Sequence, residues 1–265
     1  MHSSLPARHP YLSPDGPRVL AHRGLVTHHD AALGVVENSF AAVAAAHAAG
    51  VAYVESDCHL TADGVVILFH DDDLSRITGD PRKIADVRLP ELEELMAERG
   101  GLITLPQALE TFPDVRFNLD VKAAAAAEPV GRLVAPHAAR VLVTSFSDDR
   151  RRAALAAARA ANAPLAPATS PGSATVARLV AAQSVGLRGT VRRLLAGVDA
   201  LQIPERQGAL RIVTRGLVRA AHAANVEVHV WTVNDPDDME RLLEIGVDGL
   251  VTDRADLALS IVNGR

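Results

Sequence analysis

The sequence predicts an α/β protein, a (β/α)8 TIM barrel, formed by a single domain over residues 1–265. The chain has 265 residues, a length at which such barrels commonly fold as one domain. Hydrophobic residues make up 48% of it but aromatic residues only 3%, so Val, Leu, Ile and Ala must build the core. That composition suits a parallel sheet covered by helices. Short β-type runs alternate with helical runs along the whole chain, with an open doubly wound sheet as the alternative.

Eight runs have the composition of buried strands. They are Val19–Ala21, Ala52–Asp57, Arg116–Val121, Val141–Thr144, Pro164–Ala168, Ala200–Ile203, Glu227–Val233 and Gly249–Thr252. The segment before the first of them, residues 1–17, contains four prolines and is expected to be an irregular lead-in.

Helix-capping residues separate these runs. Asn38 or Ser39 can begin a helix that ends at Gly50, and Asp235 with Pro236 can begin one that ends at Gly246. Two more helices are expected, one from Pro90 to about Gly100 and one from Ser147.

A small hairpin insertion is predicted after the second strand, over residues 57–71. The run there is too short for a helix, and Asp63-Gly64 is a strong signal for a two-residue turn. If Ala62 pairs with Val65 across that turn, Asp57 lies opposite His70. The hairpin would then return a histidine to the mouth of the barrel.

Charge and cysteine content exclude several classes of protein. The formal net charge of −5 gives no general basic field for nucleic acid. Cys58 is the only cysteine, so no intramolecular disulfide can form. No apolar run has the length of a signal peptide or of a transmembrane helix. We therefore expect a soluble, cytoplasmic protein without membrane insertion.

Acidic residues stand at the ends of two predicted strands. Glu55 and Asp57 are two residues apart and share one face of their strand, and Asp120 ends the next strand. Carboxylates that converge at a barrel mouth repel one another unless a cation lies between them, and Mg²⁺ and Ca²⁺ prefer oxygen ligands. The alternative is that Glu55 forms ordinary salt bridges with Lys122 or Arg23.

Two histidines flank this acidic cluster, His22 after the first strand and His70 at the end of the hairpin. Histidine can both give and take a proton near neutral pH. Arg23 and Lys122 add cations suited to a phosphate group. Together these residues indicate phosphoryl chemistry without indicating which ester is cleaved.

The sequence resembles the glycerophosphodiester phosphodiesterase family, and the resemblance spans nearly the whole chain. The matching stretches, in the family's order, are AHRG (21–24), ENSF (37–40), ESDCHLTADGVVILFHDDDLSRITG (55–79), NLDVK (118–122), TSF (144–146), VWTVND (230–235) and DGLVTDR (248–254).

The resemblance implies a role for eight residues. His22 and His70 would be the catalytic pair, Glu55, Asp57 and Asp120 the ligands of a divalent metal (Mg²⁺ or Ca²⁺, with Mn²⁺ as a further candidate), Arg23 and Lys122 the phosphate contacts, and Trp231 the wall for the organic part of the substrate. It also implies hydrolysis of glycerophosphodiesters to sn-glycerol 3-phosphate and an alcohol, through a cyclic glycerol phosphate, and a place in lipid and glycerol metabolism.

Two positions depart from the family's pattern. Val36 replaces a proline before ENSF, which should alter only a loop. Asp120 replaces the usual glutamate and is one methylene shorter, so the metal would lie closer to this strand or contact it through a water.

Other functions remain open at this stage. The same site could act on lysophospholipids or on another phosphodiester, or the barrel could bind phosphate esters without turnover. His59 shares the strand face of Glu55 and Asp57 but lies farther along the hairpin, and Cys58 is expected in the core.

Overall fold

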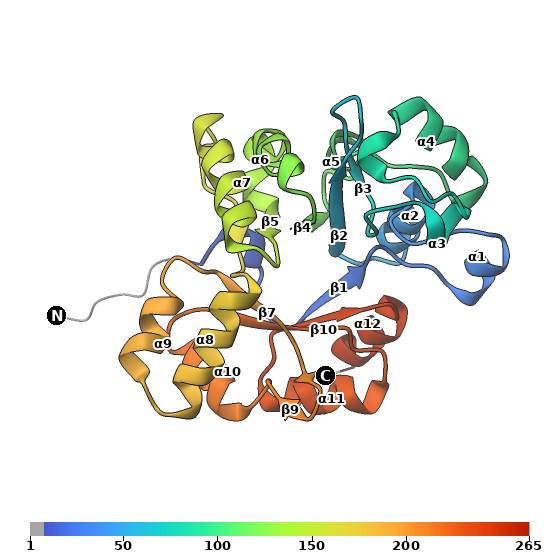
Figure 1. The fold of residues 1–265 in the computed structure, drawn as a ribbon. Helices are drawn as coiled ribbons and strands as arrows, with labels where there is room; N and C mark the ends of the chain where they lie inside the picture. The colour runs from blue at the N-terminus through green and yellow to red at the C-terminus, as the bar shows by residue number, and fades with distance from the viewer. Residues whose placement is uncertain (1–7, 265) are drawn as a thin grey trace.

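The computed structural model describes residues 8–264 and has eight parallel strands in a nearly closed barrel surrounded by helices (Figure 1). The predicted TIM barrel is confirmed. The strands are β1 (Arg18–His22), β2 (Tyr53–Leu60), β4 (Arg116–Val121), β5 (Val141–Thr144), β6 (Ala168–Thr169), β7 (Ala200–Pro204), β10 (Glu227–Trp231) and β11 (Gly249–Thr252), in the order β6-β5-β4-β2-β1-β11-β10-β7. Three short strands lie outside this ring, β3 (Val66–Leu68), β8 (Arg206–Gln207) and β9 (Leu210–Arg211).

The two ends of this order, β6 and β7, are joined by hydrogen bonds next to the strands. The N–H of Asp199 donates to the carbonyl of Thr169 at 2.9 Å. The N–H of Thr169 donates to the Asp199 carboxylate at 2.8 Å. The predicted strand over 164–168 was wrong in its extent, because only Ala168 and Thr169 pair. Pro164 and Pro167 have no N–H to give to a ladder.

Helices follow most of the barrel strands. They are α1 (His28–Ala32), α2 (Phe40–Ala48), α3 (Ser75–Thr78), α4 (Leu89–Met96), α5 (Leu105–Thr111), α6 (Ala127–Val134), α7 (Asp148–Ala160), α8 (Ser173–Ser184), α9 (Arg188–Leu194), α10 (Arg215–His222), α11 (Pro236–Ile245) and α12 (Ala255–Asn263). The side chains of Ser39, Ser147 and Asp235 cap α2, α7 and α11 as predicted. Gly246 ends α11 with φ +98°, a left-handed conformation that favours glycine.

Alternation along β2 separates the wall of the barrel from its interior. Val54 and Cys58 belong to the large apolar core between strands and helices, and Cys58 is fully buried there as expected. Tyr53 belongs to a second cluster inside the barrel. Since neighbouring residues of a strand point to opposite faces, Glu55 and Asp57 share the inner face with Tyr53.

The hairpin insertion is present, but its predicted register was wrong by one residue. Cys58 pairs with Leu68, and the N–H of Phe69 donates to the carbonyl of Asp57, so Phe69 rather than His70 lies opposite Asp57. The turn has three residues instead of two, because the N–H of Thr61 donates to the carbonyl of Val65. Gly64 takes φ +80° at its last position, which is the usual place of glycine in a three-residue hairpin loop.

A buried ion pair lies inside the barrel at the N-terminal end of the strands. Arg18 donates to both carboxylate oxygens of Glu227, at 2.7 and 2.8 Å, and both side chains are about 2% exposed. Burial raises the pKa of Glu227, but hydrogen bonds from His229 and Arg18 lower it by more. Residues 8–17 of the predicted lead-in contain one 3-10 turn, and Tyr11 packs edge-on against Tyr53 at 5.3 Å. Residues 1–7 lie outside the described part of the chain.

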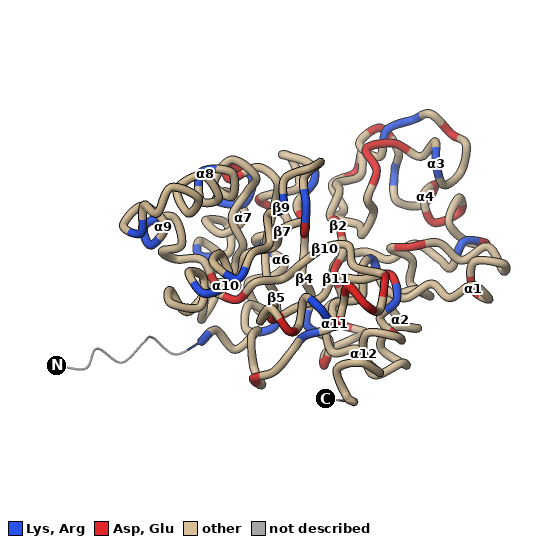
Figure 2. Tube along the Cα trace, turned by 90° about the horizontal axis from the view of Figure 1, so that it is seen from below, with Lys and Arg blue, Asp and Glu red and all other residues tan. Residues whose placement is uncertain are grey.

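Basic and acidic residues are interspersed along the helices and loops (Figure 2). Between residues 8 and 264, no helix is both long enough and apolar enough to cross a membrane.

Replacing Arg18 by Met should lower the free energy of unfolding by about 3–5 kcal/mol, because Glu227 would remain buried without its bidentate partner, with His229 and Arg8 as its remaining contacts. Since the pKa of Glu227 is depressed in the folded protein, the stability that this pair contributes is present at neutral pH and is lost as the pH falls through that pKa. Urea unfolding at several pH values measures both effects. Glu128→Gln, in the exposed Arg132–Glu128 pair, is the control and should cost less than about 0.5 kcal/mol. Equal losses in the two variants would contradict the prediction.

Candidate active site

Register brings the predicted site residues to neighbouring strand positions. His22 pairs with Glu55, Glu55 with Asn118, and Asp57 with Asp120. Neighbouring strands lie about 4.7–4.9 Å apart, so these side chains are immediate neighbours at the C-terminal mouth of the barrel. This is the end of a TIM barrel at which active sites form.

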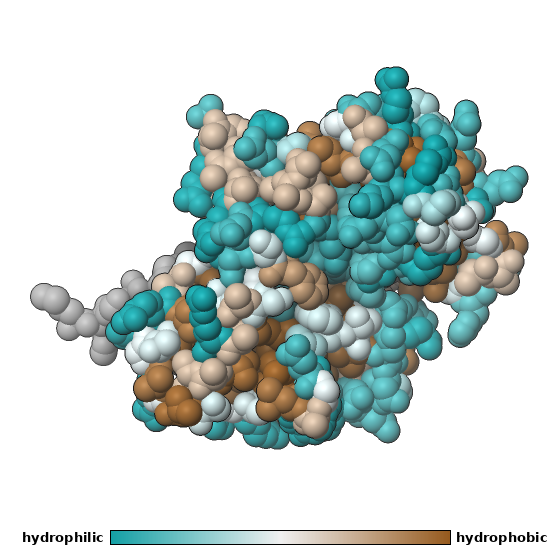
Figure 3. Space-filling model, viewed as in Figure 1, coloured by the Kyte–Doolittle hydropathy of each residue, from teal (hydrophilic) through white to brown (hydrophobic). Residues whose placement is uncertain are grey.

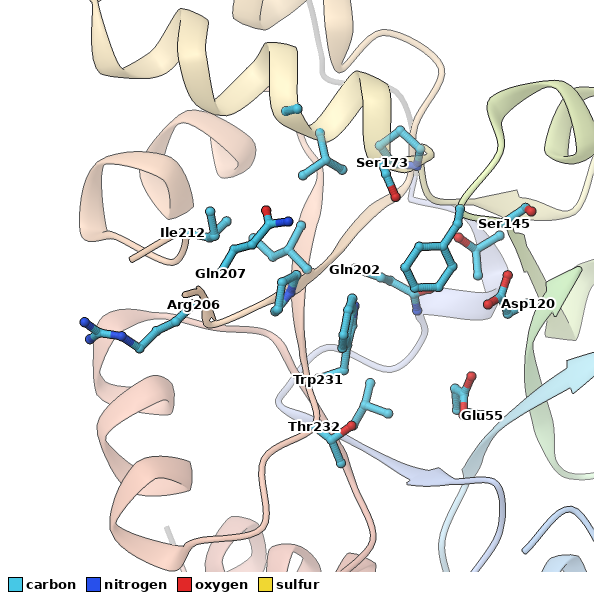
Figure 4. A pocket seen from close by; sticks show the side chains of 18 of the residues that line it. Glu55, Asp120, Ser145, Ser173, Gln202, Arg206, Gln207, Ile212, Trp231 and Thr232 are labelled. Carbon is cyan, nitrogen blue, oxygen red and sulfur yellow. The ribbon is translucent and has the colours of Figure 1, made fainter. Parts of the chain in front are cut away.

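One cavity of about 830 Å³ occupies this mouth (Figure 4). It is lined by all eight residues to which the sequence assigned a role, which are His22, Arg23, Glu55, Asp57, His70, Asp120, Lys122 and Trp231. The structure therefore brings the two histidines, the three acids and the two cations together, as the sequence predicted.

Lys122 lies between two of the acids. Its Nζ is 2.9 Å from Asp57 Oδ1 and 2.7 Å from Asp120 Oδ2. Asp57 also lies 3.3 Å from Nε of Arg23 and accepts a hydrogen bond from Asn38 at 3.1 Å. The alternative that the sequence left open, a salt bridge of Glu55 with Lys122 or Arg23, is not seen among the described residues, because these two cations pair with Asp57 and Asp120 instead.

Like charges and burial change the protonation equilibria of these groups. Burial raises the pKa of Glu55 well above its usual range, and the charges of Asp57 and Asp120 raise it further. Burial also raises the pKa of Asp120, an effect that Lys122 only partly offsets. Burial lowers the pKa of Lys122, but the attraction of the two aspartates outweighs it and the net pKa is raised.

Three buried oxygens of this cluster make no hydrogen bond with the described part of the chain. They are Oε2 of Glu55, Oδ1 of Asn118 and Oδ1 of Asp120. Buried polar atoms are normally satisfied, so this set of oxygens fits a bound cation, an oxygen-ligated one by its chemistry. Within residues 8–264, however, no three His, Cys, Asp or Glu side chains already form a metal-binding group. The Nζ of Lys122 takes part of the space between the aspartates.

Each histidine is held by a carboxylate. His22 Nδ1 lies 2.6 Å from Asp253 Oδ1, and His70 Nδ1 lies 2.6 Å from Asp71 Oδ1. The hydrogen bond from His22 lowers the pKa of Asp253. Nε2 of His22 lies 3.9 Å from Glu55 Oε2. In each ring the carboxylate fixes Nδ1 and leaves Nε2 for the cavity.

Arg23 is placed by an unusual backbone conformation. It has φ +59°, a left-handed value that is uncommon for a residue with a side chain. The next residue, Gly24, has φ +89°, and a Cβ there would lie 2.6 Å from the backbone of Ala42. The Arg23 guanidinium also pairs with Glu37 at 2.6 Å. Strained residues of this kind persist where the surroundings hold them, and they are common at functional sites.

Trp231 ends β10 and stands near the middle of the cavity (Figure 4). Its ring packs edge-on against Phe146 with the centroids 5.9 Å apart. The Nζ of Lys122 lies 5.2 Å from the centroid of the Phe146 ring. Phe146 and Trp231 thus lie next to the charged cluster.

The sequence argument missed several supporting residues. Asn38 accepts a hydrogen bond from Ser56 at 2.6 Å while it donates to Asp57. Asp253 and Asp71 orient the two histidines. All three lie in stretches that carried the resemblance, so the signal was present, but only the fold shows what they touch. His59 does not line the cavity; it is buried, and its Nε2 contacts the carbonyl of His70 at 3.2 Å.

A TIM barrel whose mouth combines two histidines, three acids and two cations in one cavity is typical of enzymes that act on phosphate esters. Residues 22–257 match the model of the glycerophosphoryl diester phosphodiesterase family. The chain belongs to this family and is a phosphoric diester hydrolase.

A curated relative agrees with the assignment, and two solved structures share the fold. The chain is 34% identical over 258 residues to a Mycobacterium tuberculosis protein named probable glycerophosphodiester phosphodiesterase 2, covering 96% of this chain and 94% of that one. A Thermotoga maritima glycerophosphodiester phosphodiesterase structure has a TM-score of 0.70 at 24% identity, covering 94% and 99%. An Oleispira antarctica phosphodiesterase structure, which contains the product sn-glycerol-3-phosphate, has a TM-score of 0.69 at 23% identity, covering 94% and 97%.

Glu55→Gln should raise the free energy of unfolding at pH 7 by about 0.5–2 kcal/mol when divalent cations are chelated, the usual range for a stabilising substitution. The raised pKa means that folding disfavours the charged form of Glu55, and the neutral amide removes that penalty. For the same reason the advantage of the variant should shrink as the pH falls and Glu55 itself becomes neutral. Thermal and urea unfolding in EDTA measure this, with Glu244→Gln on the exposed side of α11 as the control. A destabilised Glu55→Gln variant would contradict it.

Proposed function

We propose that this enzyme hydrolyses glycerophosphodiesters to sn-glycerol 3-phosphate and an alcohol, with His22 and His70 as acid and base and a divalent cation held by Glu55, Asp57 and Asp120. The observation that carries the proposal is the pair of carboxylate-held histidines that line the same cavity as the acids and cations. The names of the family and of the Mycobacterium relative, and the product in the Oleispira structure, support the substrate class.

The two histidines supply proton transfer. With Nδ1 bonded to a carboxylate, each ring presents Nε2 to the substrate, as a base when neutral and as an acid when protonated. One ring takes the proton of the attacking hydroxyl, and the other gives a proton to the departing alcohol. The partner carboxylates Asp253 and Asp71 stabilise the charged ring that forms in each step.

The cations supply binding of the phosphate. Lys122 and Arg23 both line the cavity, and each is also tied to Asp57. They can approach the non-bridging oxygens of the phosphate and stabilise the charge that develops there.

Glu55, Asp57 and Asp120 are the residues that would hold the cation. Their unsatisfied oxygens and mutual repulsion favour an oxygen-ligated ion, Mg²⁺ or Ca²⁺, with Mn²⁺ as a further candidate. When bound, such an ion polarises the phosphoryl oxygen and lowers the pKa of a nearby hydroxyl or water. To present Asp57 and Asp120 to it, the amino group of Lys122 would turn from them toward the phosphate.

Chelation should abolish hydrolysis of glycerophosphocholine, and Mg²⁺, Ca²⁺ or Mn²⁺ should restore it. Asp57→Asn should raise the metal concentration needed by on the order of 10–100-fold, because the site loses a charged ligand. Metal titration followed by calorimetry gives the affinity without an activity assay. Full turnover after exhaustive chelation, with no metal found in the protein, would refute the metal.

His22→Ala and His70→Ala should each lower kcat by on the order of 10²–10⁴-fold, the usual loss for a positioned acid or base. Asp253→Asn should cost less, because it removes only the group that orients His22. His28→Ala, on the exposed helix α1, is the control and should keep the wild-type rate.

Steady-state kinetics on variants whose circular dichroism matches the wild type test these losses. A folded His22→Ala or His70→Ala protein with a near wild-type rate would remove that histidine from the mechanism.

A further inference from the structure

A chain of ion pairs joins two sides of the active site from outside its cavity. While Oδ1 of Asp71 holds His70, the other oxygen, Oδ2, accepts a hydrogen bond from Nε of Arg76 at 2.6 Å. Nη2 of Arg76 donates to Oε1 of Glu37 at 2.7 Å. The same oxygen accepts from Nη1 of Arg23 at 2.6 Å. The chain therefore runs without a gap from the histidine of the hairpin to the arginine that follows β1.

Arg76 is the centre of this chain and lies apart from the proposed site. Among the described residues, those that line the active-site cavity do not include Arg76. It lines a separate, smaller cavity of about 280 Å³, and His22 lines both. The side chain of Arg76 is 49% exposed, and Figure 3 shows hydrophilic side chains at the surface around α3. Any effect of Arg76 on the reaction must therefore pass through the residues that it contacts.

The backbone that carries Arg76 is held in place although its side chain reaches solvent. Arg76 lies in the short helix α3, and Leu74, just before this helix, is fully buried in an apolar cluster. The N–H of Leu74 donates to the carbonyl of Arg82 at 3.0 Å. Nε of Arg99 donates to the carbonyl of Ile77, also at 3.0 Å. A side chain on a supported segment of this kind can position its neighbours.

Stability alone does not account for this arrangement, because solvent-exposed ion pairs contribute little to folding. The chain contains a second arginine of the same design. Arg82 also pairs with two carboxylates, Asp80 and Glu91, and its side chain is 44% exposed. In the described part of the chain, however, neither of these carboxylates contacts a residue of the proposed site. Arg76 differs from Arg82 in that each of its two partners also holds a residue of that site.

We propose that Arg76 is a positioning residue, which fixes the ring of His70 through Asp71 and the guanidinium of Arg23 through Glu37. This rests on the proposed function, in which His70 transfers a proton and Arg23 contacts the phosphate. The planar fork of an arginine binds carboxylates in a defined geometry. One side chain thus keeps the proton carrier and the phosphate contact in a fixed relation to each other.

The first experiment compares Arg76→Gln with Arg82→Gln on glycerophosphocholine, with the activating metal at saturation. Arg76→Gln should lower kcat by on the order of 10–100-fold, because a displacement of about 1 Å can cost that much. It should also weaken the binding of glycerol 3-phosphate, measured by calorimetry, by about threefold or more, because Arg23 loses its support. Arg82→Gln is the matched control and should keep both values. Wild-type kcat and wild-type affinity in Arg76→Gln would overturn the proposal.

A double-mutant cycle separates positioning from a general structural role. If Arg76 acts on turnover through Asp71, Arg76→Gln should lower kcat by less than about twofold once Asp71→Asn is present. Losses that multiply would show that Arg76 affects turnover by another route, and would overturn the connection through Asp71. Thermal unfolding of the four proteins of the cycle checks that each is folded.

Proton NMR tests the contact with His70 without any turnover. The hydrogen bond between Nδ1 of His70 and Asp71 is 2.6 Å long and should give a downfield proton resonance at low temperature. Its absence in His70→Ala assigns it. The resonance should be lost or broadened in Arg76→Gln and kept in Arg82→Gln. An unchanged resonance in Arg76→Gln would overturn the positioning of His70.

Arg76→Lys is the second variant if Arg76→Gln does not fold. It keeps the positive charge but places one nitrogen where the fork of arginine has two. It should therefore lose either kcat or affinity for glycerol 3-phosphate by about threefold or more. Wild-type values for both would overturn the proposal.

The outcomes separate this inference from the proposed function. Turnover of glycerophosphocholine that Arg76→Gln and Arg82→Gln leave equally unchanged overturns the positioning role and leaves the proposed function standing. Absence of turnover by the wild-type protein on every glycerophosphodiester, at any metal concentration, overturns the proposed function. The resonance of His70 then decides whether Arg76 orients the ring.

Discussion

Mutual repulsion of carboxylates at adjacent strand positions is the constraint on which the site depends. Asp57 and Asp120 are register partners on parallel strands, and Glu55 lies two residues away on the same inner face. Water cannot screen these charges well inside the barrel mouth, and their interaction is correspondingly strong. Lys122 lies between the two aspartates for this reason, and the amide of Asn38 supports Asp57.

Buried charged groups are fully hydrogen-bonded at one end of the barrel but only partly at the other. At the N-terminal end, Arg18 and Glu227 form a bidentate pair with both carboxylate oxygens occupied. At the C-terminal end, Glu55 and Asp120 each keep an oxygen without a partner in the described chain. The paired charges stabilise the fold, whereas the unpaired oxygens destabilise it unless a ligand or water binds to them. This difference between the two ends indicates a ligand site at the C-terminal end, and it does so without any comparison with related proteins.

The sequence predicted those parts of the structure that follow from local periodicity. The two-residue period of a strand placed Glu55 and Asp57 on one face, and the alternation of eight strand-like runs with helical runs indicated a barrel. Features that depend on backbone geometry could not be predicted from the sequence. The turn before Val65 has three residues rather than two, and this third residue shifts the pairing of the hairpin by one position. The contact between His22 and Asp253 joins residues 231 positions apart, so no local pattern could show it.

The acids of the site lie within strands, whereas its two histidines lie at a strand end and in a loop. Glu55, Asp57 and Asp120 lie within strands that are hydrogen-bonded to a neighbour on each side. Side chains on such strands are positioned more precisely than side chains on loops. His22 is the last residue of β1, and His70 follows the end of β3, where ladder pairing no longer sets its direction. The ring of His22 is held instead by Asp253, in the loop after β11, and the ring of His70 by the next residue in its own loop, Asp71. The three acids are therefore held in place by the sheet, whereas the ring of each histidine is held mainly by a single contact with a carboxylate.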